Sequence, residues 1–303
     1  MRAKERETIK ADFKRELTEF AGGLTDYVTA DDQQWAVKGF IDAFRNIYTI
    51  SADTKIVSKV LEIHLFPRIL EFATANGYRI VLAEHQNYYP DLSFVSAQND
   101  QVKFAVDLKT SYRLPDNPAF CSGFTLGSHG EYFINRTSRK NIQFPYSEYL
   151  GHFCLGVIYT RAAPEHIDQT KVYHLDELKS IVSVVKDFQF FAREKWEIAS
   201  DSSGSGNTAN IGSITNIGDL LAGNGMFKNL GEHWFDDYWM NYGKITVTSS
   251  TSTGKKMRQT RKITRLKDFL VYRGQSPDLV NPRVRQPVRA EKVVQPEAGE
   301  QAD

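Results

Sequence analysis

Residues 78–110 read YRIVLAEHQNYYPDLSFVSAQNDQVKFAVDLKT. Three short runs in this stretch, YRIVL, DLSFV and VKFAVDLK, are rich in residues that favour β-strands, and polar residues separate them. We therefore expect a meander of short strands. In VKFAVDLK, the two-residue period of a strand places Asp107 and Lys109 on one face and apolar side chains on the other. One face of this strand is suited to packing, and the other carries groups suited to chemistry.

Segments on both sides of the meander complete a mixed α/β core. Apolar residues recur at near-helical spacing from Asp53 to Thr74, with Asp53 as the N-cap. Pro67 lies inside this helix, and we expect it to kink or split the helix. The run FCLGVIYT, which starts at Phe153, predicts a buried strand.

Composition narrows the class of protein. With 303 residues, 41% of them hydrophobic and 25% charged, the chain can bury one sizeable core, or one core with a smaller lobe. Cys121 and Cys154 have no neighbour at CxxC spacing, so we expect neither a disulfide framework nor a zinc site. The start of the chain is highly charged, and no apolar run approaches the roughly 20 residues that span a bilayer. We expect a cytoplasmic protein with no membrane contact.

Two polar segments stand out after the buried strand. DSSGSGNTANIGS, from Asp201, has almost no apolar content and predicts a loop. Residues 254–289 hold eleven Lys and Arg against two Asp, although the net charge of the whole chain is only +1. Such a region could neutralise DNA phosphates, and it could equally be a solvated basic tail.

The candidate chemistry rests on two acids and a lysine. Pro90-Asp91 opens the run that precedes VKFAVDLK, and a hairpin-like pairing of the two runs would bring Asp91 beside Asp107. Two adjacent carboxylates suit Mg²⁺, which takes few protein ligands and keeps several waters. Lys109 would then face the same metal-bound water and a phosphate. The spacing alone leaves a second interpretation open, an exposed strand edge with an ordinary salt bridge.

Longer segments supply a resemblance to a known family. The chain resembles, in the same order, the motifs of EcoRV-type restriction endonucleases, part of the PD-(D/E)xK nuclease superfamily, in DTKIVSKVLEIHLFPRIL, QNYYPDLSFV, AVDLKTSY, FTLGS, RKNIQFPYSEYLGHF, GVIYTRAA, KWEIASDSSGSGNTANIGSI, DDYWMNY and VYRG. The resemblance runs from about Ser51 to Gly274, and GSGNTANIGS is its most specific piece. It implies an α/β (α+β) fold with a mixed five-stranded sheet flanked by helices.

The resemblance also assigns catalytic roles. It implies that Asp91 and Asp107 are the catalytic acids that ligate Mg²⁺, for which Mn²⁺ can substitute, and that Lys109 is the catalytic lysine. Glu62 matches a further acid implicated in the metal chemistry of that family or in positioning the helix. Its alternative role is that of an ordinary glutamate on a helix surface.

The implied DNA contacts lie on several segments. The recognition loop is Gly204, Ser205, Gly206, Asn207 and Thr208, with Asn210 beside it. Glycines let backbone groups approach base edges, and the Asn207 carboxamide can bond adenine in the major groove. Composition alone would favour a flexible Gly/Ser linker here. Matches to further DNA-contacting positions of the family are Gln86, Asn87, Thr54, Thr110, Lys140 and Arg273, and His85 stands where a second glutamine is usual.

The implied protein is a type II restriction endonuclease that cuts a short palindromic DNA site, which we expect to be GATATC cut to blunt ends. A palindrome is matched most simply by a homodimer, and a companion DNA methyltransferase is expected in the host. We divide the chain into an N-terminal helical and dimerisation region (1–50), a nuclease core (51–274) and a disordered basic tail (275–303). Two alternatives are a PD-(D/E)xK nuclease of repair or recombination and a catalytically silent DNA-binding protein.

Overall fold

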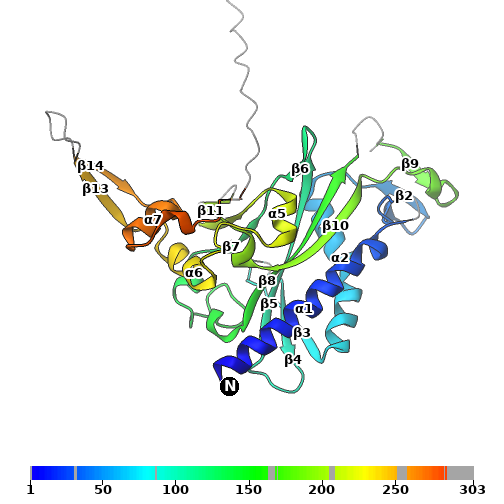
Figure 1. Cartoon of the computed structure of the whole chain (residues 1–303). Coiled ribbons are helices and arrows are strands. Elements are labelled where there is room, and N and C mark those ends of the chain that lie inside the picture. Colours follow the sequence, from blue (N-terminus) through cyan, green and yellow to red (C-terminus); the bar gives the residue numbers. More distant parts are fainter. Residues whose placement is uncertain are drawn as a thin grey trace, which may run out of the picture.

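A mixed β-sheet forms the centre of the molecule (Figure 1). The computed structural model describes residues 2–30, 33–85, 87–162, 168, 170–204, 209–250, 258–282 and 284. The strands of the sheet, in spatial order, are β10 (Val185–Glu194), β8 (Gly151–Arg161), β5 (Lys103–Leu114), β4 (Leu92–Ser96) and β3 (Tyr78–Leu82), and β6 (Asn117–Cys121) pairs with the end of β5. Strands β5 and β8 are parallel, and the other neighbours are antiparallel. The predicted mixed sheet and the predicted buried strand at Phe153 are confirmed.

Two long helices, α1 (Ala3–Val28) and α2 (Thr54–Ala75), pack together against one face of this sheet (Figure 1). Phe13 of α1 is fully buried, and its ring stacks on Phe104 of β5 at 4.0 Å between centroids. The carboxylate of Asp53 accepts hydrogen bonds from two amides of the first turn of α2, as expected of an N-cap. The expected split at Pro67 is wrong, because α2 runs through this proline. The apolar side chains buried on both sides of Pro67 hold the helix to the core.

A second core covers the opposite face of the sheet. It is built from β7 (Thr125–Ser128), β11 (Ala199–Ser203), β12 (Asn210–Ser213) and the helices α3 (Glu131–Ile134), α4 (Lys195–Ile198), α5 (Ile217–Ala222), α6 (Glu232–Asn241) and α7 (Leu266–Tyr272). The aromatic residues of α6 belong to this core, since Tyr238 and Trp239 are fully buried.

The polar segment from Asp201 is a β-hairpin and not the loop that its composition predicted. Strands β11 and β12 pair antiparallel, and β12 also pairs with β7. The amide of Gly204 donates to the carbonyl of Asn210 at 2.8 Å. The prediction from composition was wrong because backbone hydrogen bonds hold these strands together. Ser, Gly and Asn form such bonds as readily as other residues that carry a backbone N–H. Residues 205–208 lie outside the described residues.

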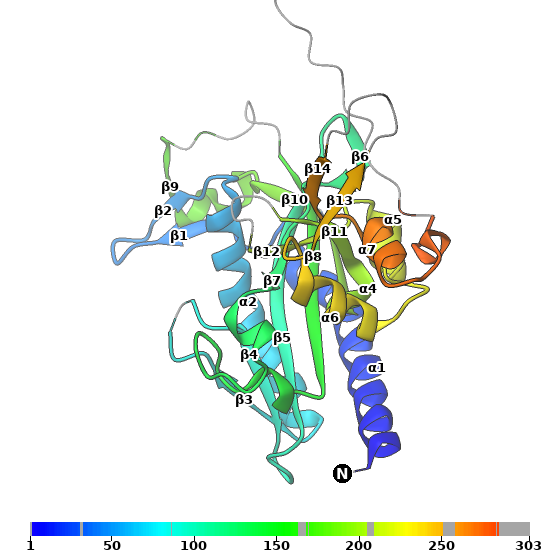
Figure 2. The same ribbon diagram turned by 90° about the vertical axis from the view of Figure 1, so that its left-hand side faces the viewer.

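Two smaller β-structures extend from the central body (Figures 1 and 2). We call the first the small lobe, and it consists of β1 (Gly39–Ile41), β2 (Asn46–Thr49), β9 (Val172–His174) and the 3-10 helix η3 (Leu175–Ser180). The second, which we call the arm, is the hairpin of β13 (Thr246–Ser250) and β14 (Arg258–Lys262). A further 3-10 helix, η1 (Tyr146–Glu148), precedes β8.

The chain beyond Gln275 is ordered for longer than its composition predicted. The 3-10 helix η4 (Pro277–Leu279) follows it, and Val280 and Asn281 are buried. The side-chain amide of Asn281 donates to the backbone carbonyl of Asn224 at 2.7 Å, which fixes this segment on the second core. Apart from residue 284, residues 283–303 of the expected tail lie outside the described residues.

Both cysteines, Cys121 and Cys154, are buried and carry free thiols. None of the helices in the described parts of the chain combines the length and the apolar character needed to cross a membrane.

Candidate active site

The two candidate acids are neighbours because of the register of β4 and β5. Leu92 pairs with Val106, so Asp91 stands opposite Asp107 at the point where β4 begins. The amide of Asp91 donates to Oδ1 of Asp107 at 3.2 Å, and the amide of Leu108 donates to Oδ2 of Asp91 at 2.9 Å. Backbone groups of the two strands therefore hold both carboxylates in place. The expected juxtaposition of Asp91 and Asp107 is confirmed.

Lys109 completes the set on the same face. Its Nζ lies 3.4 Å from Oδ2 of Asp91 and 3.5 Å from Oδ2 of Asp107. Strand β5 is paired on both sides, by β4 and β8, so these residues do not belong to an exposed sheet edge. The Asp107 side chain is only 4% exposed, whereas that of Asp91 is 41% exposed. Asp107 is thus the buried member of the pair, and Asp91 opens toward solvent.

A fourth charged residue, Lys195, was missed by the sequence analysis. It is the first residue of α4, its side chain is 5% exposed, and its Nζ lies 3.1 Å from Oδ2 of Asp107. The ammonium also lies 3.8 Å from the centre of the Tyr89 ring, within the range of a cation–π contact. Neither spacing nor periodicity relates residue 195 to residue 107, because they meet only when α4 packs on the sheet.

Burial and the neighbouring charges together shift the pKa values of the two acids in opposite directions. Burial raises the pKa of Asp91 despite the attraction of Lys109. Burial alone would also raise the pKa of Asp107, but Lys109 and Lys195 outweigh it and lower this pKa to about 2. Asp107 is therefore fully ionised at neutral pH, as a metal ligand must be.

A cavity of about 480 Å³ opens over these groups. It is lined by Asp91, Asp107 and Lys109 together with Asn87, Tyr88, Tyr89, Thr125, Gly127, Ser128, Glu131, Tyr132, Asn141 and Asn210. Two residues expected to contact DNA, Asn87 and Asn210, thus line the same cavity as the candidate catalytic set. Residues more than 100 positions apart in the chain meet here.

Glu62 takes a different place. Its carboxylate pairs with Lys59 at 2.9 Å on the exposed side of α2, and it lines a neighbouring cavity of about 650 Å³ with Asp91. Among the described residues, no group of three or more acidic, His or Cys side chains converges on one point where a metal could sit. Glu62 thus shares a cavity with Asp91, and its part in the metal chemistry stays a prediction.

The other candidate DNA contacts are spread over the surface. Thr54 accepts a hydrogen bond from Arg161 at 2.5 Å, and Thr110 follows Lys109 on β5. Lys140 is exposed, and Arg273 pairs with Asp237 at 2.7 Å. A Cβ at Gly204 would lie 2.5 Å from the Cγ2 methyl of Thr125 on β7, so packing against β7 already favours glycine there. The remaining candidates, Gln86, Ser205, Gly206, Asn207 and Thr208, lie outside the described residues.

The donor set fits a hard divalent cation. Asp91 and Asp107 offer carboxylate oxygens, and no hydrogen bond from another described residue reaches Oδ1 of Asp91. Mg²⁺ prefers a site in which two protein carboxylates bind it and water or phosphate oxygens fill the remaining coordination positions. The buried thiol of Cys154, whose pKa burial raises to about 12, is a poor alternative ligand.

Fold and site together define the class. An acid at the start of one central strand, with an Asp-x-Lys pair on the strand beside it in a mixed sheet, is typical of PD-(D/E)xK nucleases. The family model described as restriction endonuclease EcoRV matches residues 31–274. A curated relative, the type II restriction enzyme EcoRV of Escherichia coli, is 37% identical over 217 residues, which cover 71% of this chain and 86% of the relative. The chain belongs to the EcoRV restriction endonuclease family.

The contacts of Lys195 lead to a prediction about stability. Lys195→Met leaves the buried Asp107 with Lys109 as its remaining cation, and breaking a buried ion pair costs about 3 kcal/mol or more. We expect the free energy of unfolding, measured by urea denaturation, to fall by about 3 kcal/mol. Lys186→Met, at an exposed position on β10, should change it by less than about 0.5 kcal/mol. Equal effects of the two substitutions would contradict this account of Lys195.

Proposed function

We propose that this chain is a magnesium-dependent type II restriction endonuclease that makes a double-strand cut in a short palindromic DNA site. The single observation that carries the proposal is the convergence of Asp91, Asp107 and Lys109 on one cavity in a chain of this family. A catalytically silent DNA-binding protein would need a damaged set, and all three groups are present here.

Each residue has a distinct part in the proposed hydrolysis. Asp91 and Asp107 would hold Mg²⁺, which, when bound, supplies charge stabilisation and an activated water. Lys109 places a fixed positive charge beside both carboxylates, where it can stabilise the negative charge that develops on the phosphate. Lys195 contacts the same Oδ2 atom of Asp107 as Lys109 does, and it holds the carboxylate in its orientation. The backbone amides of Asp91 and Leu108 limit the movement of both acids.

Recognition is proposed to lie in the turn between β11 and β12. The hairpin is anchored to β7, and β7 contributes Thr125 and Ser128 to the wall of the catalytic cavity. The two strands that flank the base-reading residues would therefore stand in a fixed relation to the groups that cut. The cut site is proposed to be GATATC, and the host is proposed to protect its own sites with a companion methyltransferase.

The catalytic assignment predicts separate losses for two substitutions. Asp107→Ala should abolish cleavage, as should excess EDTA, because each removes the metal. Lys109→Ala should also abolish cleavage but should still bind DNA in a gel-shift assay with Ca²⁺, since one lysine adds little to the total attraction for phosphates. Circular dichroism checks the fold, and Asp100→Ala, at an exposed site paired with Arg79, serves as the matched control. Full cleavage in EDTA would sink the assignment.

The specificity is tested by mapping cut ends on a sequenced plasmid. We expect blunt cuts at the centre of GATATC, because an Asn carboxamide and backbone groups in the turn can read the outer bases. Asn207→Ala should cost about 1–3 kcal/mol of discrimination in each half-site. Staggered ends, or cuts at sites that lack GAT in each half, would show that this loop reads another sequence. Cuts without sequence preference would instead favour a nuclease of repair or recombination.

A homodimer is proposed because a two-fold pair of subunits matches a palindrome. The small lobe offers a surface for the second copy. It exposes large apolar side chains that a monomer in water would bury: Phe40, Ile41, Phe44, Tyr48, Val172, Leu175 and Leu178. Phe44, which is 85% exposed, is the most accessible of them.

The dimer proposal predicts a change in the state of association. Phe44→Ser should raise the dissociation constant of the dimer at least about tenfold in sedimentation experiments, since losing a buried aromatic anchor costs about 2 kcal/mol or more. Val271→Ser, which changes an exposed residue of α7, should leave it unchanged. A wild type that sediments as a monomer at all concentrations would rule the dimer out.

A further inference from the structure

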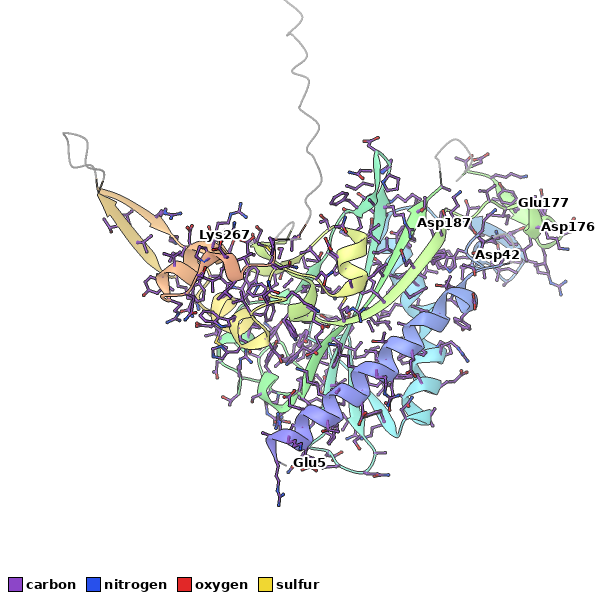
Figure 3. The ribbon with its side chains drawn as sticks, viewed as in Figure 1. Glu5, Asp42, Asp176, Glu177, Asp187 and Lys267 are labelled. Atoms are coloured by element: carbon purple, nitrogen blue, oxygen red, sulfur yellow. The ribbon has the colours of Figure 1, made fainter. Side chains whose placement is uncertain are left out.

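The arm carries an unbalanced positive charge that the catalytic site does not use. Residues 244–267 contain eight Lys and Arg and no Asp or Glu. Figure 1 shows β13 and β14 projecting from the body beyond α7. Figure 3 places Lys267 on this side of the molecule, whereas Asp42, Asp176 and Glu177 lie at the opposite end, on the small lobe. The segment that carries the arm is therefore rich in cations without acids, whereas the small lobe carries charges of both signs.

The register of the arm gives its two faces different characters. Residues directly opposite each other in an antiparallel pair share a face, so Thr246 and Lys262 lie on the same face as Thr248 and Thr260. All four of these side chains are exposed. The other face carries Val247, which packs against the second core, and Arg261.

Neighbouring acids neutralise only some of the cations. Both terminal nitrogens of Arg261 bond Asp268, at 2.7 and 3.2 Å, and Arg265 lies 3.4 Å from Asp201. In the described part of the chain, neither Lys262 nor Lys267 forms an ion pair with an acid. The outer face of the arm thus combines one uncompensated cation with a row of three hydroxyl groups.

The base of the arm is joined to the recognition hairpin. The buried carboxylate of Asp201, on β11, accepts a hydrogen bond from the amide of Leu266 at 3.2 Å. Tyr238 donates to the carbonyl of Asp201 at 2.6 Å and to that of Thr264 at 3.0 Å. Because the segment after β14 and the strand β11 share this joint, the base of the arm and the β11–β12 hairpin strands keep a fixed relation to each other.

We propose that the arm binds the phosphate backbone of the DNA duplex outside the recognition sequence. Hydroxyl groups and lysines are common partners of phosphate oxygens, and a two-stranded β-ribbon has the width of a major groove. The contacts at Asp201 indicate which partner the arm binds. A surface that is fixed to a base-reading hairpin would lie against the flanking part of the same DNA duplex. The inference rests on the proposed function, which takes duplex DNA as the substrate.

Flank length is the variable that tests this proposal. Two duplexes are centred on the sequence that the wild type cuts, one of roughly 12 base pairs and one of roughly 40 base pairs, and affinity is measured by gel shift with Ca²⁺ in place of Mg²⁺. Lys262→Glu should weaken binding to the long duplex about tenfold and lower its salt dependence by about one counterion, with less than about twofold change on the short duplex. Lys4→Glu makes the same charge change in the first turn of α1, far from the arm, and should alter neither affinity.

Each outcome has a defined meaning. Equal weakening on both duplexes, or no weakening on the long one, overturns the proposal for the arm. A second variant, Thr248→Ala with Thr260→Ala, keeps every charge and should give a smaller loss that is again confined to the long duplex. If the wild type cuts no sequenced plasmid, the proposed function is wrong. If the wild type cuts but Lys262→Glu binds the long duplex as tightly as the wild type does, only the proposal for the arm is wrong.

Discussion

The buried carboxylate of Asp107 is the constraint on which the site depends. A charge that is removed from water in the middle of a sheet is costly, and it persists only where cations and hydrogen-bond donors surround it. Here Lys109 and Lys195 supply the cations, and the amide of Asp91 supplies the donor. Each of these partners comes from a different part of the chain. The site therefore forms only when β4, β5 and α4 are assembled, which couples the catalytic groups to the completion of the fold.

The sheet separates stability from chemistry by its two faces. On one face, Phe104 and Val106 pack against α1 and α2 in the main core. On the other, Ala105 belongs to the second core, and Asp107 and Lys109 face the cavity. Because alternate residues of one strand serve both purposes, a slip of one residue in the register of β5 would turn the two charged groups into the main core and Phe104 away from it. The parallel pairing with β8 and the antiparallel pairing with β4 both fix that register.

The parts proposed to meet DNA are organised around the second core. The β11–β12 hairpin pairs with β7, whose residues line the catalytic cavity, and Asp201 ties the same hairpin to the segment that follows the arm. One hydrogen-bonded unit, rather than separate loops, would thus hold the residues proposed to cut the DNA, to read its bases and to contact its flanks. The small lobe lies at the end of the molecule opposite the arm, so a second copy on its apolar surface would leave the arm accessible (Figure 1).

The sequence by itself determined the alternation in VKFAVDLK, the N-cap at Asp53 and the buried strand at Phe153, because each depends on neighbours a few residues away. The resemblance of longer segments added the family and the roles of Asp91, Asp107 and Lys109. Composition failed for the hairpin from Asp201 and for the order after Gln275, since pairing and burial there depend on distant strands and on Asn224. Only the tertiary structure placed Lys195 against Asp107, paired Glu62 with Lys59 at the mouth of a second cavity, and joined the arm to the recognition hairpin. These contacts link residues up to about 90 positions apart, and no local pattern in a chain records which distant segments will pack together.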